Sequence, residues 1–369
     1  MKQRLLCTFW LVAAIVWGSA QIPAGYYDAA VGKSGEELRT ALHQIIRAHT
    51  LVSYNDLWDA YRSTDKMPSE KVWDIYSDVP GGRATYYYDF GTDQCGNYSQ
   101  EGDCYNREHT IPQSWFGEKD TLRSDLFHVY PTDGWVNNKR GNLQYGMVPS
   151  PTWTSTNGSK LGPCGYPGCS GKAFEPIDAY KGDLARSYFY MTVCYMDKDF
   201  GQTPESMFSG SQLLDWARQM MVEWHYADPV SEKEINRNQV IYSQKQHNRN
   251  PFIDCPELVD YLFGSRVGEA WYPVCFEWDP DAVGDHASSN LLSCRLYPNP
   301  ASDVVTVESN KGGNISRIEV FDVAGRLLRQ YDDIASPSFR MGTEDLKDGY
   351  YFVKVTVGGA SMVLTMVRQ

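Results

Sequence analysis

Long apolar runs are scarce in this chain of 369 residues. The only one lies at the start, where Lys2 and Arg4 precede an apolar stretch over residues 5–17 and small residues at 18–20. This order is typical of a secretory signal peptide, so we expect residues 1–20 to be removed; a buried N-terminal helix is the alternative. No other run approaches the roughly 18 apolar residues that span a bilayer, so we expect no transmembrane segment in the mature chain.

Basic residues are in the minority. The 34 lysines and arginines face 46 aspartates and glutamates, which gives a formal net charge of −12 at pH 7. A protein with this charge does not attract a phosphate backbone at long range. Any binding of nucleic acid therefore requires a locally basic groove or bound cations.

Cysteines number nine, and Cys7 falls within the expected signal peptide. The remaining eight form an even set, which favours disulfides in an oxidising compartment. The pairs Cys95 with Cys104 and Cys164 with Cys169 would each close a small loop. A zinc site at Cys164 and Cys169 is the alternative, although the sequence lacks a matching second pair with a two-residue gap.

Apolar residues recur at helical intervals through much of the chain. They predict helices over 35–49, 53–61, 132–140, 182–197, 211–228 and 231–248, the last three amphipathic. Two runs rich in aromatics, 71–78 and 84–90, predict strands. We therefore predict an α+β fold with a mainly helical catalytic domain, residues 21–278, that carries a small sheet.

The composition and the pattern of apolar residues change near residue 279. A polar linker over 279–293 is followed by short alternating runs separated by Gly, Asn and Asp, which predict a small all-β, sandwich-like domain over 294–369. The stretches "LYPNPASDVVTVE", "IEVFDVAGRLL" and "DLKDGYYFVKVTV" resemble the C-terminal sorting domain of the type IX secretion system. The resemblance implies that the type IX machinery exports the chain to a secreted or cell-surface location. A small carbohydrate-binding sandwich is the alternative.

The stretch "YNREHTIPQSWF" places Glu108 beside His109. A neutral imidazole can take a proton from water near physiological pH, and a carboxylate can hold Mg²⁺. Together they form a minimal hydrolytic unit, although a solvated surface turn is the commoner setting for such a pair. Adjacent side chains on a regular strand face opposite sides, so a shared site requires a turn. Thr110 and Gln113 fit a capping box that would supply it, with Pro112 in the first helical turn.

Four stretches occur in the order found in one known family: "NREHTIPQSWF", "SDLFHVYPTDGWVNNKRGN", "FEPIDAYKGDLARSYFYM" and "RNQVIYSQKQHNRNPFIDCPELV". Over residues 38–263 the chain resembles the bacterial endonuclease I family of secreted, divalent-metal-dependent nucleases with a ββα-metal active site. The resemblance implies hydrolysis of phosphodiester bonds in DNA or RNA, without sequence specificity, to products with 5′-phosphate ends. A monomer is expected.

The family pattern transfers to particular residues of this sequence. It implies that His109 is the general base and that Glu108 binds the metal ion. An asparagine on the following short helix completes the protein ligands; Asn137 is the match, with Asn138 and Asn142 as further candidates. The implied ion is Mg²⁺, with Mn²⁺ or Ca²⁺ as alternatives.

The family's phosphate-steadying arginine lies in an insertion that is shortened here, which leaves Arg123 and Arg140 as candidates. His128 is a candidate for orienting a ligand. Three further basic residues are candidates for phosphate contacts: Arg107, Lys245 and Arg249.

Two other functions fit the sequence less well. A catalytically inactive, surface-displayed binding protein would be expected to lose one of Glu108, His109 and Asn137, and all three are present. A phosphoesterase of small substrates would use the same residues, and only its substrate range would distinguish it.

Overall fold

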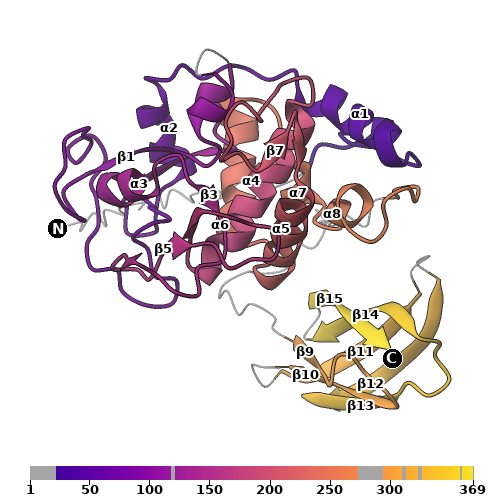
Figure 1. Cartoon of the computed structure of the whole chain (residues 1–369). Helices are drawn as coiled ribbons and strands as arrows, with labels where there is room; N and C mark the ends of the chain where they lie inside the picture. The colour runs from indigo at the N-terminus through magenta and orange to yellow at the C-terminus, as the bar shows by residue number, and fades with distance from the viewer. Residues whose placement is uncertain are drawn as a thin grey trace, which may run out of the picture. The chain divides into compact units, whose positions relative to one another are not determined.

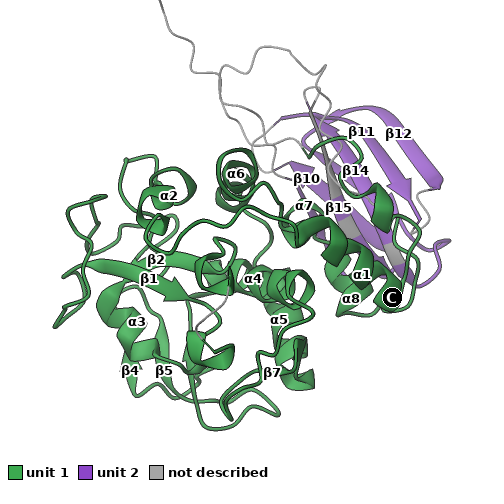
Figure 2. Ribbon diagram, turned by 90° about the horizontal axis from the view of Figure 1, so that it is seen from above, with its two compact units in different colours: residues 1–278 green, residues 279–369 purple. Residues whose placement is uncertain are grey.

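The computed structural model describes residues 22–117, 121–272, 294–309, 313–322, 326–357 and 360–368. The expected signal peptide and the expected linker lie outside these residues. The chain divides into two compact units, residues 1–278 and 279–369 (Figure 2). Within the described parts of the chain, none of the helices has the length and apolarity needed to cross a membrane.

The first unit is mainly helical, as predicted (Figure 1). Its α-helices are α1 (Gly35–Ile46), α2 (Leu57–Thr64), α3 (Gly134–Arg140), α4 (Lys181–Cys194), α5 (Asp215–Ala227), α6 (Glu232–Val240), α7 (Pro251–Asp254) and α8 (Leu258–Leu262). A π-helical turn, Ile241–Lys245, continues α6, and 3₁₀ turns lie at Asp28–Ala30, Gln113–Trp115, Thr121–Ser124 and Asp178–Tyr180.

Helix α4 forms the centre of this unit. The sequence predicts an amphipathic helix here, and the structure corrects this, because every residue of α4 is buried. A helix that is surrounded on all sides loses its polar face. The charged side chains that remain are paired: Arg186 donates to both carboxylate oxygens of Glu234 on α6, at 2.5 and 2.8 Å.

The strands of the first unit are short. The antiparallel pair β1 (Tyr105–His109) and β2 (Val129–Asp133) sets His109 opposite Val129 and leads directly into α3. A four-stranded sheet has the order β3-β6-β5-β4, and β7 pairs with β8. Their bounds are β3 (Gln144–Tyr145), β4 (Trp153–Thr154), β5 (Lys160–Pro163), β6 (Lys172–Glu175), β7 (Phe208–Ser209) and β8 (Gln212–Leu213).

The strands predicted over 71–78 and 84–90 are wrong, because these segments form turns and irregular chain. Tyr76 and Tyr88 are buried without strand pairing. Tyr76 donates a hydrogen bond to Glu108, and Tyr88 donates one to Asp133. These two tyrosines therefore support β1 and α3 through hydrogen bonds, although the segments that carry them are not strands.

Asp133 starts helix α3. Its Oδ1 accepts a hydrogen bond from the backbone N–H of Val136 at 2.8 Å, and Gly141 ends the helix with φ +55°. This short helix is thus held at both ends beside β1.

The second unit is all β, as predicted. Its strands are β9 (Cys294–Tyr297), β10 (Val304–Ser309), β11 (Ile315–Phe321), β12 (Leu327–Ser336), β13 (Ser338–Gly342), β14 (Gly349–Val357) and β15 (Ala360–Arg368). They form two antiparallel sheets of orders β13-β10-β9 and β12-β11-β14-β15. Val305 and Val307 from one sheet share a core with Val320 and Val353 from the other, so the unit is a sandwich.

Two disulfides form as the loop spacing predicts, Cys95–Cys104 and Cys164–Cys169. The second disulfide removes the zinc alternative, because its sulfurs are bonded to each other. Cys194 is a buried thiol on α4, so the even number of cysteines does not mean that each one is paired.

Candidate active site

Strand β1 and helix α3 pack face to face. Alternate strand residues share a face, and residues three apart on a helix share a face. Asn106 accordingly accepts a hydrogen bond from Asn137 at 2.7 Å, and Glu108 accepts one from Arg140 at 2.9 Å. The structure thus brings the predicted metal ligands Glu108 and Asn137 to one β1–α3 interface.

Glu108 is 2% exposed. Its Oε1 accepts hydrogen bonds from the hydroxyl of Tyr76 at 2.7 Å, from Arg140 at 2.9 Å and from the hydroxyl of Tyr145 at 3.4 Å. Burial raises the pKa of Glu108, and the charge of Arg140 opposes this. All the hydrogen bonds that the described residues make to this carboxylate reach Oε1, which leaves Oε2 for a cation.

Arg140 is 1% exposed, and its guanidinium lies behind β1. Besides Glu108, it donates to the backbone carbonyls of His109 at 2.7 Å and Thr110 at 2.6 Å. This corrects the expectation of a phosphate contact for Arg140, because these bonds and the burial keep the group away from a substrate. Its role is to support the end of β1.

His109 is held by one ring nitrogen. Its Nε2 lies 2.9 Å from the backbone carbonyl of Arg123; since a carbonyl only accepts, Nε2 carries the hydrogen and Nδ1 keeps its lone pair. The amide Nε2 of Gln113 donates a long hydrogen bond to Nδ1, at 3.4 Å. Burial and the neighbouring His128 lower the pKa of His109 to about 3. The imidazole is therefore neutral at physiological pH, as a general base requires.

The expectation that the backbone leaves strand geometry at Glu108 and His109 is wrong. Both residues belong to β1, because pairing with β2 continues as far as His109. The expected capping box is absent: Pro112 precedes the 3₁₀ turn at Gln113–Trp115, and no side chain caps that turn. Glu108 and His109 thus have different neighbours on the two faces of the strand, and a phosphate group can meet both only at the end of β1.

Two arginines flank the imidazole. The ring of Tyr54 stacks on His109, with centroids 5.8 Å apart and planes at 27°. The guanidinium carbons of Arg107 and Arg123 lie 3.6 and 4.0 Å from the centre of the Tyr54 ring. These cations supply the locally basic patch that an acidic chain needs to bind nucleic acid.

His128 is fully buried beside His109, with ring centroids 5.6 Å apart. Its Nε2 lies 2.5 Å from the carbonyl oxygen of Leu122. The Nδ1 atom has no hydrogen-bond partner among the described residues. His128 therefore packs against the candidate base and bonds to the segment that carries Arg123.

The remaining sequence candidates lie less favourably. Asn138 and Asn142 are exposed, whereas Asn137 faces β1. Lys245 lies at the end of the π-helical turn. Arg249 is 1% exposed and donates to both carboxylate oxygens of Asp254, at 2.7 and 2.8 Å, so the expected substrate contact for Arg249 is corrected.

A second group of potential metal ligands lies in the core. One ligand atom from each of His49, Asp125 and Cys194 falls within 4.8 Å of the others. The carboxylate of Asp125 already accepts four hydrogen bonds, which come from the Phe127 amide, Tyr190, Tyr195 and Gln246. These donors satisfy the buried charge without a cation, so the group fits a structural polar network.

Sequence reasoning missed the tyrosines of the site. Tyr76 and Tyr145 donate to Glu108, and Tyr54 stacks on His109, from segments up to 55 residues away along the chain. Only the abundance of tyrosine, 25 residues, hinted at such roles.

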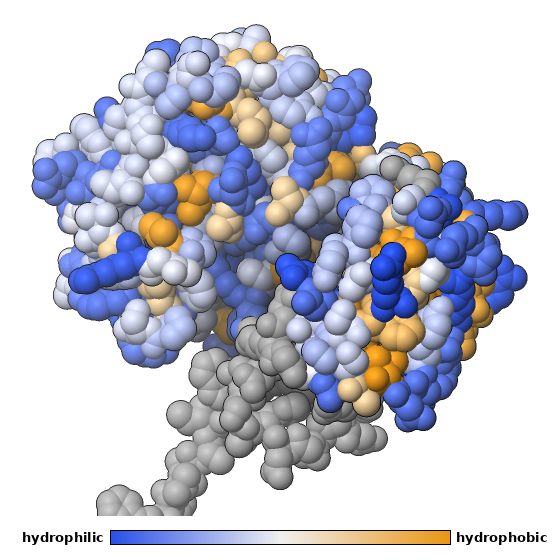
Figure 3. Space-filling view, turned by 90° about the horizontal axis from the view of Figure 1, so that it is seen from below, coloured by the Kyte–Doolittle hydropathy of each residue, from blue (hydrophilic) through white to orange (hydrophobic). Residues whose placement is uncertain are grey.

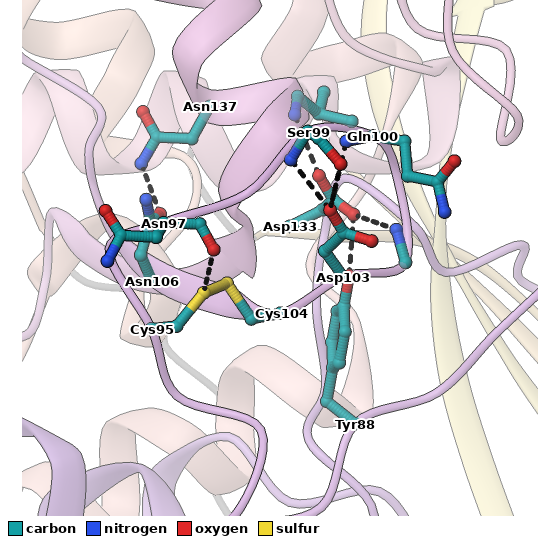
Figure 4. Close-up of a disulfide and its surroundings, with 12 residues drawn as sticks. Tyr88, Cys95, Asn97, Ser99, Gln100, Asp103, Cys104, Asn106, Asp133 and Asn137 are labelled. Carbon is teal, nitrogen blue, oxygen red and sulfur yellow. Dashed lines mark hydrogen bonds between the residues drawn. A yellow bond between two sulfur atoms is a disulfide. The ribbon is translucent and has the colours of Figure 1, made fainter.

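The disulfide Cys95–Cys104 closes a loop that braces α3 (Figure 4). In this loop the N–H of Gly102 donates to Asp133, the N-cap of α3, at 2.8 Å. Cys104 directly precedes β1. The disulfide thus ties together the two elements that carry Glu108 and Asn137.

Replacing Cys95 and Cys104 by serine is expected to lower the free energy of unfolding by about 2–3 kcal/mol, because the unfolded chain gains freedom. Catalytic rate falls as well, since β1 and α3 lose their brace. Urea unfolding and cleavage rate check this. The control is Cys164→Ser with Cys169→Ser, which is expected to lower stability alone; equal losses of rate in both variants would contradict the brace.

Asp74 makes stability depend on pH. Its Oδ2 accepts a hydrogen bond from the N–H of Asp133 at 2.8 Å, and burial together with the charge of Asp133 raises the pKa of Asp74 to about 7. Between about pH 4 and pH 7 the folded chain therefore keeps a proton that the unfolded chain has lost. Stability falls as pH rises through this window, by at most about 1.4 kcal/mol per pH unit.

Asp74→Asn removes the carboxyl group that titrates. The stability of the variant relative to the parent protein is therefore expected to increase from pH 4 to pH 7 and then to stay constant. Urea unfolding of both proteins across this range checks the prediction. A difference that is independent of pH would contradict it.

The site brings together an imidazole, a carboxylate and an amide oxygen, with two arginines at its edge; side chains of these kinds suit the hydrolysis of phosphate esters. A family model described as endonuclease I matches residues 34–257. The chain therefore belongs to the endonuclease I family, and it is a nuclease, a phosphodiester hydrolase. The family is typically metal-dependent.

Curated relatives agree with the family. The chain is 33% identical to an extracellular ribonuclease of Bacillus subtilis (strain 168) over 243 residues, which cover 64% of this chain and 78% of the relative. It is 34% identical to an extracellular ribonuclease of Bacillus amyloliquefaciens over 258 residues, 68% of this chain and 82% of the relative. Endonuclease-1 of Buchnera aphidicola subsp. Acyrthosiphon pisum (strain APS) is 25% identical over 168 residues, 40% and 59% of the two chains.

The second unit has a family of its own. A model described as a secretion system C-terminal sorting domain matches residues 295–369. This is the sorting domain of type IX secretion, so the nuclease is secreted or attached to the cell surface.

Proposed function

We propose that this protein is a divalent-metal-dependent endonuclease that cleaves RNA and DNA without sequence specificity, and that β1, β2 and α3 form its ββα-metal motif. The observation that carries the proposal is the β1–α3 interface, which holds a buried carboxylate and an asparagine, with a neutral histidine as the next residue of β1. The names of the Bacillus relatives support RNA as a substrate.

The residues of this interface fit a hard cation. Glu108 offers Oε2, and Asn137 offers Oδ1, because its Nδ2 already donates to Asn106. Mg²⁺ prefers oxygen ligands and keeps several of its waters, which suits a site with two protein ligands; Mn²⁺ and Ca²⁺ are the alternative ions. Held by these two residues, a cation would polarise the scissile phosphate and would neutralise the charge that develops on the leaving oxygen.

His109 activates the water. Its Nδ1 accepts a proton from the water molecule, whose oxygen forms a bond to phosphorus while the bond from phosphorus to the 3′ oxygen breaks. The products are a 5′-phosphate end and a 3′-hydroxyl end. The Arg123 carbonyl keeps the imidazole in the required tautomer, since it accepts the hydrogen of Nε2.

Arg123 is the better candidate for the phosphate contact. Its side chain is exposed and lies over Tyr54, next to His109, whereas Arg140 is buried behind the strand. A guanidinium there would stabilise negative charge on the phosphate oxygens in the transition state. Phosphate contacts carry no sequence information, which supports non-specific cleavage.

Incubation with supercoiled plasmid and with structured RNA, in Mg²⁺ and in excess EDTA, tests the proposal. Cleavage of both substrates in Mg²⁺ and of neither in EDTA is expected. Hydrolysis of a chromogenic phosphodiester without cleavage of either polymer would favour a small-substrate phosphoesterase. Binding without any hydrolysis would favour an inactive surface protein.

A further inference from the structure

A groove of about 470 Å³ opens beside the candidate active site. Its lining residues, which we name the Tyr54 groove, are Tyr54, Trp58, Gln94, Cys95, Gly96, Asn106 and Arg107. A second hollow of the described residues, about 760 Å³ against α1, is lined by none of the predicted site residues. The Tyr54 groove, in contrast, includes Arg107 in its lining.

The groove adjoins both halves of the proposed catalytic machinery. Tyr54 stacks on His109 on one side, with ring centroids 5.8 Å apart. Asn106 accepts the hydrogen bond from Asn137 on the other side, at 2.7 Å, and the two side chains point toward each other next to the Cys95–Cys104 disulfide (Figure 4). A group bound in this groove lies next to the phosphate that would be cleaved.

Arg107 is fixed in orientation within the groove. Its guanidinium carbon lies 3.6 Å from the centre of the Tyr54 ring and 4.5 Å from that of Trp58, and Nη1 donates to the Tyr54 carbonyl at 2.6 Å. No carboxylate of the described residues forms an ion pair with it. A guanidinium held flat against aromatic rings keeps its other N–H groups for bidentate contact with a phosphate.

The rest of the lining suits an unpaired nucleobase. Trp58 offers an aromatic side chain, and the amides of Gln94 and Asn106 carry both hydrogen-bond donors and acceptors. Single strands are recognised by such stacking and by hydrogen bonds to exposed base edges. In a duplex, the same base edges are paired and the same faces are stacked.

We propose that the Tyr54 groove binds the nucleotide next to the scissile phosphate in unpaired form, with Arg107 on its phosphate and Trp58 against its base. The protein then cleaves single-stranded nucleic acid in preference to duplex. This inference rests on the proposed nuclease function and adds its substrate form. Arg107 and Trp58 act in substrate binding, and His109 in the chemical step.

Steady-state kinetics of the full chain in Mg²⁺ test this, with a labelled single-stranded oligonucleotide and the same strand in a duplex. The parent protein is expected to have a higher kcat/KM on the single strand. Arg107→Ala and Trp58→Leu are expected to raise its KM roughly 5- to 100-fold with a smaller change in kcat, as the loss of one stacked base predicts. Trp58→Phe keeps an aromatic face and is expected to retain most of the affinity.

Arg83→Ala is the matched control, since Arg83 is exposed and lies outside the groove. Arg107→Lys keeps the charge but not the planar fork, and a folded protein with intermediate KM is expected. Unchanged KM in the Arg107 and Trp58 variants would contradict nucleotide binding in the Tyr54 groove. Equal kcat/KM on both substrates would contradict it as well. Either result would leave the proposed nuclease function unaffected. Failure of the nuclease function would instead appear as no hydrolysis of either substrate by the parent protein.

Discussion

His109→Asn is expected to lower kcat for phosphodiester hydrolysis by about 100- to 10,000-fold, the usual contribution of a positioned general base. Asparagine is too short to reach the Arg123 carbonyl that Nε2 contacts, so a urea unfolding curve of the variant checks that the fold survives. Its amide cannot take a proton from water at neutral pH. The rate of single-turnover cleavage in saturating Mg²⁺ measures the effect.

His247→Asn is the control for this change. His247 is exposed and has a φ of +61°, a conformation that asparagine tolerates well, so its replacement is expected to leave both fold and rate unchanged. A second variant, His109→Ala, leaves room for added imidazole, which is expected to restore part of the rate. Activity of His109→Asn within a few-fold of the parent protein would remove His109 from the mechanism.

Glu108→Gln is expected to lower the free energy of unfolding by about 3–5 kcal/mol, because it leaves the charge of Arg140 buried without its partner. The ion pair spans 2.9 Å between side chains that are 1% and 2% exposed, so little water can compensate. The cleavage activity of this variant is also expected to fall, because glutamine is a weaker ligand for a hard cation than glutamate. Urea unfolding and cleavage as a function of Mg²⁺ concentration measure the two effects.

The double variant Glu108→Gln with Arg140→Met separates these roles. Removal of both buried charges is expected to recover much of the lost stability, because no ionised group is then left buried without a partner. Activity is expected to stay low, since the ligand is still absent. If Glu108→Gln unfolded at the same urea concentration as the parent protein, the buried ion pair would contribute nothing; if the double variant regained full activity, Glu108 would not hold the metal ion.

Local patterns predicted the parts of the site that lie close together in the chain. The helix predicted over 132–140 is α3, with Asp133 and Gly141 at its ends; Asn137 on this helix was singled out by the family resemblance alone. The family resemblance singled out Glu108 as a candidate metal ligand and His109 as the candidate base. In the structure both residues lie at the end of β1. The capping box at Thr110 failed because β2 pairing, a contact across some 20 residues, extends β1 to His109.

Contacts between distant segments could not be predicted from the sequence. Arg140 reads as an exposed cation at a helix end, and only the packing of α3 on β1 turns it toward Glu108. Tyr76 lies in an aromatic run whose alternation favours a strand, yet it is buried as a donor to the same carboxylate. Such roles depend on which segments meet in space, and no local propensity encodes that.

The chemical identity of the RNA ends tests the central claim most directly. If His109 activates water and a divalent cation assists, digestion of a 3′- or 5′-labelled RNA in Mg²⁺ yields 5′-phosphate and 3′-hydroxyl ends, and excess EDTA stops the reaction. Attack by the ribose 2′-hydroxyl would instead release 2′,3′-cyclic phosphates and would need no cation. Cyclic phosphate ends, or undiminished cleavage in EDTA, would contradict the account.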